Sequence, residues 1–256
     1  LSAAFCSRSN ARRSAGVRAA SAAAVARRSA SAAAVPCGSS TAAIAAGAAA
    51  AIAAGRLADE IVSISIPQRK GDPLVIANDE GVRAETTMES LGGLKPAFDK
   101  DGTITAANAS QLSDGGSAVV MMSERFVKDR GIKALGQVVS YGMVAGPDNA
   151  SLLTQPSRAI LKALNKVGMT VSDINLFELN EAFATVGIAS MAELGISDDI
   201  VNVNGGAIAL GHPIGMSGNR VALTILHELR RRGGGVGAAA LCGGGGQGDA
   251  IIVRTV

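Results

Sequence analysis

Two segments near the C-terminus hold the residue types best suited to chemistry. In the first, LCGGGGQGD at 241–249, Cys242 stands directly before four glycines. A thiol can act as a nucleophile or as an acid and base. Glycines at 243 and 244 let a ligand oxygen approach the backbone N–H groups, as an oxyanion hole requires. This pattern predicts acyl transfer or proton abstraction next to a thioester carbonyl. The alternative is that Cys242 only fills the apolar core, where free cysteines are common.

His212 is the second candidate. It lies in a loop rich in glycine, NGGAIALGHPIGMSG at 204–218, directly before an expected helix. The positive end of a helix dipole lowers the pKa of an imidazole, which keeps it neutral and ready to exchange a proton. The alternative is a histidine that only stabilises the loop by a hydrogen bond. The other histidine, His227, falls on the helix side opposite the apolar residues, so we expect it to be a solvated surface residue.

From residue 135 onward, apolar runs and helical periodicity alternate, with glycines at the helix ends. The element order is β-α-β-α-β-α-β-β, which predicts an α/β fold with a mixed, mostly parallel sheet between helices. In such sheets, sites form at the carboxyl ends of strands. The expected strands are 135–144, 174–178, 200–203, 236–242 and 250–254, and the expected helices are 156–167, 181–194 and 218–232, with Ser217 as candidate cap of the last.

The region before residue 135 is less regular. The alanine-rich residues 42–55 predict a helix, and the alternating residues 61–66 predict a short strand that stops at Pro67. Residues 67–105 are rich in Gly, Pro, Asp and Lys, which indicates an irregular excursion long enough to suspect function. The apolar run SAVVMM at 117–122 predicts a buried strand.

The charge of the chain is unevenly distributed. Residues 1–50 hold six of the 24 Lys and Arg residues and none of the 21 acidic residues, so the remainder is mildly acidic. This balance, with only 2% aromatic residues, argues against nucleic-acid binding. The Arg, Ser and Ala composition of residues 1–40 is typical of an organellar transit peptide. It predicts that the protein is located in the mitochondrion or another organelle. If residues 1–40 are not a transit peptide, a cytoplasmic location is expected. The alternatives for this leader are a disordered low-complexity tail and a faulty gene prediction.

Several other classes of protein are disfavoured. The uncharged run at 29–55 is mostly Ala and Gly, whose transfer into lipid gains little, so no membrane span is predicted. The three cysteines are scattered without CxxC spacing, which predicts no disulfide framework and no metal site. GGGGQG at 243–248 formally satisfies GxGxxG, but a strand follows it where a dinucleotide fold needs a helix. GMSGN at 215–219 misses the last glycine of GxSxG, which weakens a serine-hydrolase reading.

Taken together, three motifs resemble the thiolases: NEAFA at 180–184, NVNGGAIALGHPIGMSG at 202–218 and LCGGGGQGDA at 241–250. The resemblance extends upstream through DEIV at 59–62 and covers about residues 45–256. GHPIGMSG and GGGGQGD are more like acetyl-CoA acetyltransferases than long-chain ketoacyl thiolases. The resemblance implies a reversible Claisen condensation of two acyl-CoA molecules, in which one Cys is acylated and a second Cys removes the α-proton of acetyl-CoA.

The roles of the site residues are what this resemblance implies. Cys242 matches the second, acid/base cysteine, and His212 matches the histidine that activates the nucleophile and helps to hold the thioester oxygen. Asn180 matches the asparagine that positions an oxyanion-hole water, and the N–H of Gly244 matches an oxyanion donor. Ser110 matches a serine near the pantetheine of CoA. Acyl-CoA thioesters are then the substrates, with no permanently bound cofactor, and a homo-oligomer is expected if the N-terminal half is present.

The nucleophilic cysteine is where the sequence departs from the family. Cys37 is the only candidate, but it lies about 22 residues before Asp59, where the family has more than 100. A leader or linker cysteine is the favoured interpretation. The expected division is a leader at 1–40, a remnant of the N-terminal thiolase domain and the loop domain at 41–125, and a C-terminal thiolase domain at 126–256. The chain alone is expected to be inactive or crippled. A non-catalytic CoA-binding or assembly partner, and a 3-ketoacyl-CoA thiolase of other chain length, remain open.

Overall fold

The computed structural model describes residues 37–256, and their side chains from residue 41 onward. The expected leader at 1–40 therefore lies almost wholly outside the described residues. The side chain of Cys37 lies outside them too. The expected domain division at residues 125 and 126 stays a prediction.

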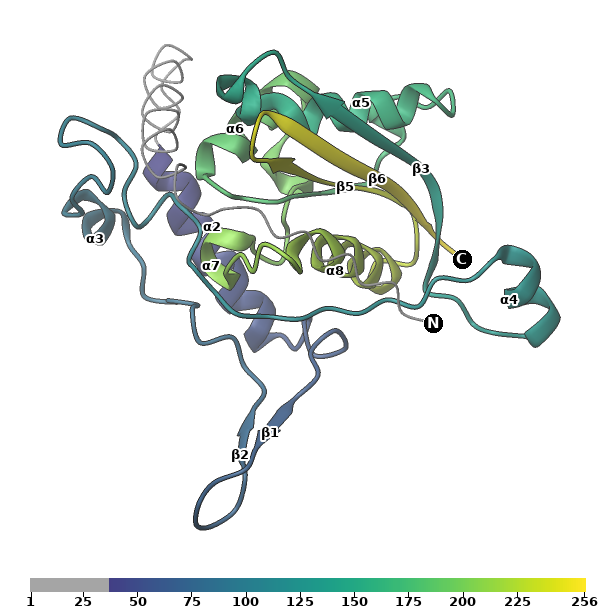
Figure 1. Cartoon of the computed structure of the whole chain (residues 1–256), viewed down its shortest axis with the longest axis horizontal. Helices are drawn as coiled ribbons and strands as arrows, with labels where there is room; N and C mark the ends of the chain where they lie inside the picture. The colour runs from purple at the N-terminus through teal and green to yellow at the C-terminus, as the bar shows by residue number, and fades with distance from the viewer. Residues whose placement is uncertain (1–36) are drawn as a thin grey trace, which may run out of the picture.

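A four-stranded sheet forms the centre of the C-terminal part (Figure 1). Its order is β3-β6-β5-β4, and the expected α/β class with a mixed sheet is confirmed. The expectation that the sheet is mostly parallel is wrong, since β4 and β5 are parallel whereas β3–β6 and β5–β6 are antiparallel. A tight glycine turn joins β5 to β6, and strands joined so closely pair antiparallel. The strands are β3 (Gly136–Ala145), β4 (Leu176–Leu179), β5 (Val236–Gly243) and β6 (Gln247–Thr255).

Helices cover both faces of this sheet and make three layers (Figure 1). Helix α5 (Gln155–Asn165) lies on one face with α6 (Ala184–Leu194) beside it, and α8 (Ser217–Arg231) lies on the other. Alternate strand residues face opposite layers. Phe177 accordingly packs in the cluster under α5, and Leu176 in the cluster under α8. Two apolar cores therefore fix the helices relative to the strand ends.

Helix α8 differs in two details from the prediction. Ser217 is the first residue of the helix, with Met216 at the N-cap position, so Ser217 is not the cap. His227 is half-buried rather than fully solvated.

The expected strand at 200–203 is wrong in this structure. Residues Asp198–Ile200 form a 3₁₀ turn, and only Val201 bridges to Phe177. Asn202 then adopts a positive φ of 46°, which asparagine tolerates better than most residues. Its side chain pairs with the main chain of Leu179, accepting from the N–H and donating to the carbonyl oxygen at 2.8 Å each. A side chain therefore replaces the strand pairing that the apolar pattern predicted.

Two helices in the loops after the strands also differ. Helix α6 begins at Ala184 rather than near Glu181, because residues 180–183 are not helical and the extended Phe183 bridges to Ala109. The loop at 204–218 contains a short helix, α7 (Ala207–Leu210), that the glycines did not indicate. Shorter 3₁₀ turns are Asn149–Thr154 and Val171–Asp173.

The region before β3 is mostly irregular apart from short helices and strands, as expected for 67–105. The alanine-rich helix is confirmed as α2, which packs against α7, and the short strand forms at the end of 61–66. This strand, β1, pairs antiparallel with β2 in a hairpin that projects from the rest of the molecule (Figure 1). The elements are α2 (Cys37–Ala53), β1 (Ile64–Ile66), β2 (Leu74–Ile76), α3 (Met88–Gly92) and α4 (Glu124–Arg130).

The prediction of a buried strand at 117–122 is wrong. This segment has no regular structure, and its apolar side chains are exposed, Val120 by 82%. No strand of the described residues pairs with it. A run of apolar residues shows that burial is favourable, but a strand also needs a partner for its backbone groups. Across the described part of the chain, every helix is too short or too polar to cross a bilayer.

Candidate active site

Asn180 and His212 form the centre of the candidate site. Asn180 directly follows β4 and is fully buried, and its backbone N–H donates to the carbonyl oxygen of Ala240 on β5 at 2.9 Å. Its side-chain nitrogen Nδ2 lies 3.2 Å from Nε2 of His212. The two loops that the sequence singled out therefore meet at the carboxyl end of β4, where an α/β sheet places its site.

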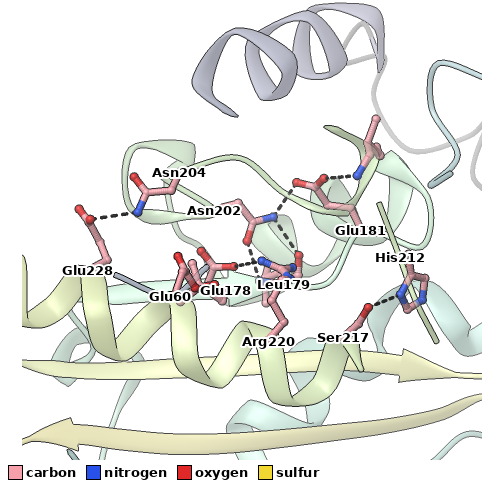
Figure 2. Close-up of polar contacts among 12 residues, drawn as sticks. Glu60, Glu178, Leu179, Glu181, Asn202, Asn204, His212, Ser217, Arg220 and Glu228 are labelled. Carbon is pink, nitrogen blue, oxygen red and sulfur yellow. Dashed lines mark hydrogen bonds and ion pairs between the residues drawn. The ribbon is translucent and has the colours of Figure 1, made fainter. Parts of the chain in front are cut away.

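Ser217 fixes the orientation of the imidazole (Figure 2). Its Oγ lies 2.6 Å from Nδ1 of His212 and donates to the carbonyl oxygen of Pro213 at 3.0 Å. Because the hydroxyl proton is directed to Pro213, the hydroxyl oxygen accepts from Nδ1–H. This assigns the free lone pair of the imidazole to Nε2, which accepts from the amide of Asn180. The sequence interpretation missed Ser217 as a site residue; its only signal was a hydroxyl at the start of the helix that follows His212.

The pKa of His212 lies below its ordinary value. Burial is the largest cause, and the positive charge of Arg220 adds to it. The sequence predicted a neutral imidazole because of the helix dipole. In the structure, burial and the neighbouring guanidinium are what lower the pKa of His212. A neutral imidazole with its lone pair on Nε2 can accept a proton from a thiol or a bound ligand.

Asn180 also has an unpaired group. Its Oδ1 is buried and makes no hydrogen bond to a described residue. A buried acceptor without a donor costs about 1–3 kcal/mol, which a bound donor group recovers. The atom is therefore suited to hold a water or a ligand beside His212.

Cys242 is the last but one residue of β5, paired with Gly248 of β6. It is half-buried and belongs to neither core cluster, which disfavours a core-filling role. Burial raises the pKa of its thiol to about 11. The sulfur is consequently protonated at neutral pH, and its thiolate, once formed, is a stronger base than an ordinary one.

The turn after Cys242 is built from glycines with different tasks. Gly245 and Gly246 have φ values of 90° and 77°, which favour glycine. Gly244 has an ordinary φ, and a Cβ on it would meet nothing within 4 Å. The open space beside Gly244 supports the expectation that its backbone is accessible to a ligand oxygen.

Ser110 lies against the segment that carries Asn180. Its backbone N–H and its Oγ both donate to the carbonyl oxygen of Ala182 at 3.2 Å. Asn180 and His212 are thus in direct contact, whereas Ser110 is linked to them through Ala182, two residues after Asn180. Cys242 joins them through β5, two residues beyond the Ala240 carbonyl that binds Asn180. The roles of these residues stay predictions.

Two further residues hold the loop that leads to His212, and the sequence interpretation missed both. Buried Glu181 accepts from Nδ2 of Asn202 at 2.6 Å and from the N–H of Ile208 at 3.2 Å (Figure 2). A Cβ at Gly206 would lie 2.1 Å from its carboxyl group, which explains that glycine. Gln111 donates to the carbonyl oxygen of Ala209 at 3.0 Å and accepts from the N–H of His212 at 3.4 Å.

A metal site was not expected. Within residues 37–256 no group of three or more His, Cys, Asp and Glu side chains is arranged to hold an ion.

Two family profiles match the chain, one in each half. The profile described as "Thiolase, N-terminal domain" matches residues 14–125, and "Thiolase, C-terminal domain" matches residues 132–255.

Curated relatives show the same similarity. The chain is 58% identical over 200 residues to a "Probable acetyl-CoA acetyltransferase" of Mycolicibacterium smegmatis, which covers 78% of this chain and 51% of the relative. It is 50% identical over 200 residues to an "Acetyl-CoA acetyltransferase" of Thiocystis violacea, covering 78% of this chain and 50% of the relative. The chain therefore spans about half the length of the curated relatives that it matches.

Solved structures agree on the fold. An acetyl-CoA acetyltransferase of Bacillus anthracis superposes with a TM-score of 0.85 at 38% identity, over 93% of this chain and 60% of that one. A human mitochondrial 3-ketoacyl-CoA thiolase in complex with CoA gives a TM-score of 0.85 at 38% identity. This match covers 93% of this chain and 59% of the thiolase chain.

Proposed function

Because this chain belongs to the thiolase family, we propose that it contributes the acid/base and CoA-binding side of a thiolase-type acyltransferase. The reaction is the reversible condensation of two acetyl-CoA molecules to acetoacetyl-CoA and CoA. The observation that carries the proposal is the chain of contacts from Ser217 through His212 to Asn180 at the end of β4. It presents a neutral base, a buried amide and a nearby thiol, as carbon–carbon bond formation next to a thioester requires.

In the proposed step, the sulfur of Cys242 acts as a base. Its thiolate takes one α-proton from acetyl-CoA, and the electron pair of that C–H bond forms the new carbon–carbon bond to the acyl group of an acylated cysteine. The carbon–sulfur bond of that acylated cysteine breaks, and its sulfur leaves as a thiolate, so the negative charge passes from Cys242 to that cysteine. The raised pKa of Cys242 suits this step, because a stronger base removes a carbon-bound proton more readily.

The thioester oxygens need donors while they carry negative charge. One proposed donor is the N–H of the exposed Gly244, and buried Asn180 keeps an unpaired Oδ1 that can hold a water. His212 and these groups make the polar surroundings in which such an oxyanion is stabilised. Ser110, fixed to the carbonyl of Ala182, is the proposed contact for the pantetheine of CoA.

The choice of acetyl groups over longer chains rests on the relatives. The relatives at 50–58% identity are named acetyl-CoA acetyltransferases, whereas the solved structures of an acetyl-CoA acetyltransferase and a 3-ketoacyl-CoA thiolase are both 38% identical and do not distinguish the two. Comparing acetoacetyl-CoA with 3-ketoacyl-CoA of eight or more carbons tests this choice. Faster thiolysis of the longer substrates refutes it.

The first test of the function is thiolysis of acetoacetyl-CoA by the purified chain, followed by chromatography of the CoA esters. We expect CoA binding but no robust turnover, because the described residues place no second thiol beside His212. Robust turnover contradicts this expectation, and its loss in Cys37→Ser then identifies Cys37 as the nucleophile. Binding of CoA that is unchanged in Ser110→Ala contradicts the assignment of Ser110.

Two properties of the whole protein complete the proposal. The composition of residues 1–40 supports import into an organelle, which a fusion of these residues to a fluorescent protein tests: a signal confined to the cytosol refutes it. Homo-oligomerisation is proposed from the resemblance alone, and analytical ultracentrifugation tests it, since a monomer at all concentrations refutes it.

A further inference from the structure

A buried pair of charged side chains lies beside the candidate active site (Figure 2). Arg220 is one turn after Ser217 on α8, and its side chain is 14% exposed. Glu178 is two residues before Asn180 on β4, and its side chain is 3% exposed. Nη1 of Arg220 lies 3.6 Å from Oε2 of Glu178. The pair thus joins the two elements that carry the Ser217–His212–Asn180 contacts.

The arginine makes no hydrogen bond that would explain its burial. The 3.6 Å between Arg220 Nη1 and Glu178 Oε2 is short enough for an ion pair but too long for a hydrogen bond. None of the three guanidinium nitrogens of Arg220 hydrogen-bonds to a described residue. A buried ion pair with such geometry adds little to stability, because desolvation offsets the attraction. What Arg220 contributes is its positive charge.

Several titratable groups face this charge. Glu178 lies on β4, Glu181 in the loop after Asn180, Glu60 in the segment after α2 and Asp79 in the segment after β2. Burial raises the pKa of each of these carboxyl groups, and Arg220 lowers it in part. Glu60 is also fixed to α8, since it accepts from Oγ1 of Thr224 at 2.6 Å.

The imidazole of His212 is the one basic group on which Arg220 is seen to act within the described residues, and the charge opposes its protonation. We propose that Arg220 is a positioning residue of the site: it lies between the first turn of α8 and the end of β4 and presents a positive charge to the imidazole of His212, which sets the protonation state in which His212 contacts Asn180. This inference rests on the proposed function.

The consequence follows from the contact with Asn180. Nε2 of His212 accepts from the Asn180 amide only while it carries no proton. If His212 were protonated, two N–H groups would face each other and the contact would be lost. A neutral residue at position 220 therefore favours the protonated imidazole at a pH where the wild-type ring is neutral.

The test is an NMR titration of the two histidines, which needs no turnover. The chain has only His212 and His227, so a His227→Gln variant assigns both signals. We expect the titration midpoint of His212 to move upward in Arg220→Gln and to stay in place in Arg220→Lys, which keeps the charge. Arg158→Gln is the matched control, since Arg158 pairs with Glu193 at 3.5 Å between α5 and α6 and is not among the groups acting on His212.

Arg220→Gln leaves Glu178 buried without its partner, which can prevent folding. The double variant Glu178→Gln/Arg220→Gln removes both charges and is titrated in the same way. An unmoved His212 midpoint in a folded variant that lacks the Arg220 charge overturns the proposal, as does an equal shift in Arg158→Gln.

A second measurement separates this proposal from the proposed function. Exchange of the acetyl-CoA methyl protons with solvent deuterium is followed against pH. We expect the acidic limb of the profile to move upward in Arg220→Gln but not in Arg220→Lys. Absence of exchange in the wild type refutes the proposed function, but the NMR titration of His212 can still be carried out. If Arg220→Gln catalyses exchange and the acidic limb of its pH profile does not move, the proposed role of Arg220 is refuted.

Discussion

Glu228 gives a prediction of stability whose size can be worked from its contacts. Its carboxylate on α8 is 2% exposed and accepts from Arg231 Nε at 2.8 Å and from Arg232 Nε at 2.6 Å. It also accepts from Nδ2 of Asn204 at 3.0 Å (Figure 2). Oδ1 of Asn204 in turn accepts from Arg56 at 3.0 Å. The carboxylate thus anchors the start of the loop that leads to His212.

These donors lower the pKa of Glu228 from 4.5 to about 2, although burial acts in the opposite direction. A carboxyl group whose pKa is lower in the folded state stabilises that state above the unfolded pKa, and this stability is lost as the pH falls from about 4.5 towards 2. The shift corresponds to about 3 kcal/mol at neutral pH. Arg231 and Arg232 are 45% and 41% exposed, so solvent screening reduces the contribution to roughly 1–2 kcal/mol.

The variant is Glu228→Gln, measured by urea unfolding at pH 7 and at pH 3. We expect it to be less stable than the wild type by roughly 1–2 kcal/mol at pH 7 and by clearly less at pH 3, where this carboxyl group is largely protonated in the unfolded chain but still mostly ionised in the folded one. Glu124, which is 68% exposed and pairs with Lys128, which is 72% exposed, provides the control Glu124→Gln. A difference between Glu228→Gln and wild type that is constant with pH refutes the reasoning.

Three further predictions concern the site. Gly246→Ala should destabilise the fold by more than about 2 kcal/mol, because the φ of Gly246 is 77° and a Cβ would lie 2.2 Å from the carbonyl oxygen of Asp148. The control Gly244→Ala should change the stability by less than about 0.5 kcal/mol. Equal losses of stability for the two variants in urea unfolding contradict this prediction. Alkylation of Cys242, mapped by mass spectrometry, should keep accelerating up to about pH 11, and a plateau near pH 9 contradicts the raised pKa. Ser217→Ala should cost about 1–3 kcal/mol by leaving Nδ1–H of the imidazole unpaired, and an unchanged melting temperature counts against the assigned tautomer.

Periodicity was enough to predict the elements that bury a continuous apolar face. Helices α5 and α8 and strands β5 and β6 lie close to their expected positions because burial of those faces dominates their stability. The expected strand at 117–122 failed because its apolar character says nothing about a pairing partner. The strand at 200–203 failed because one residue, Asn202, turns the chain and pairs through its side chain.

The candidate site shows the same division. His212, Cys242 and Asn180 were found because their residue types stand out in loops after strands. Glu181, Gln111 and Ser217 were missed because their parts depend on distant partners, such as the N–H of Ile208, that no local pattern reveals. Arg220 likewise looks like one charged residue on an amphipathic helix until the structure places it beside Glu178.

The central claim is that Cys242 moves a proton on the α-carbon of acetyl-CoA. The most direct measurement is proton NMR of acetyl-CoA incubated with the chain in deuterated buffer, which follows loss of the methyl signal without any need for a nucleophilic cysteine. The account predicts exchange that rises with pH, is abolished in Cys242→Ala, and falls strongly in His212→Asn and in Asn180→Ala. Exchange that persists in Cys242→Ala, or no exchange by the wild-type chain with acetyl-CoA bound, contradicts it.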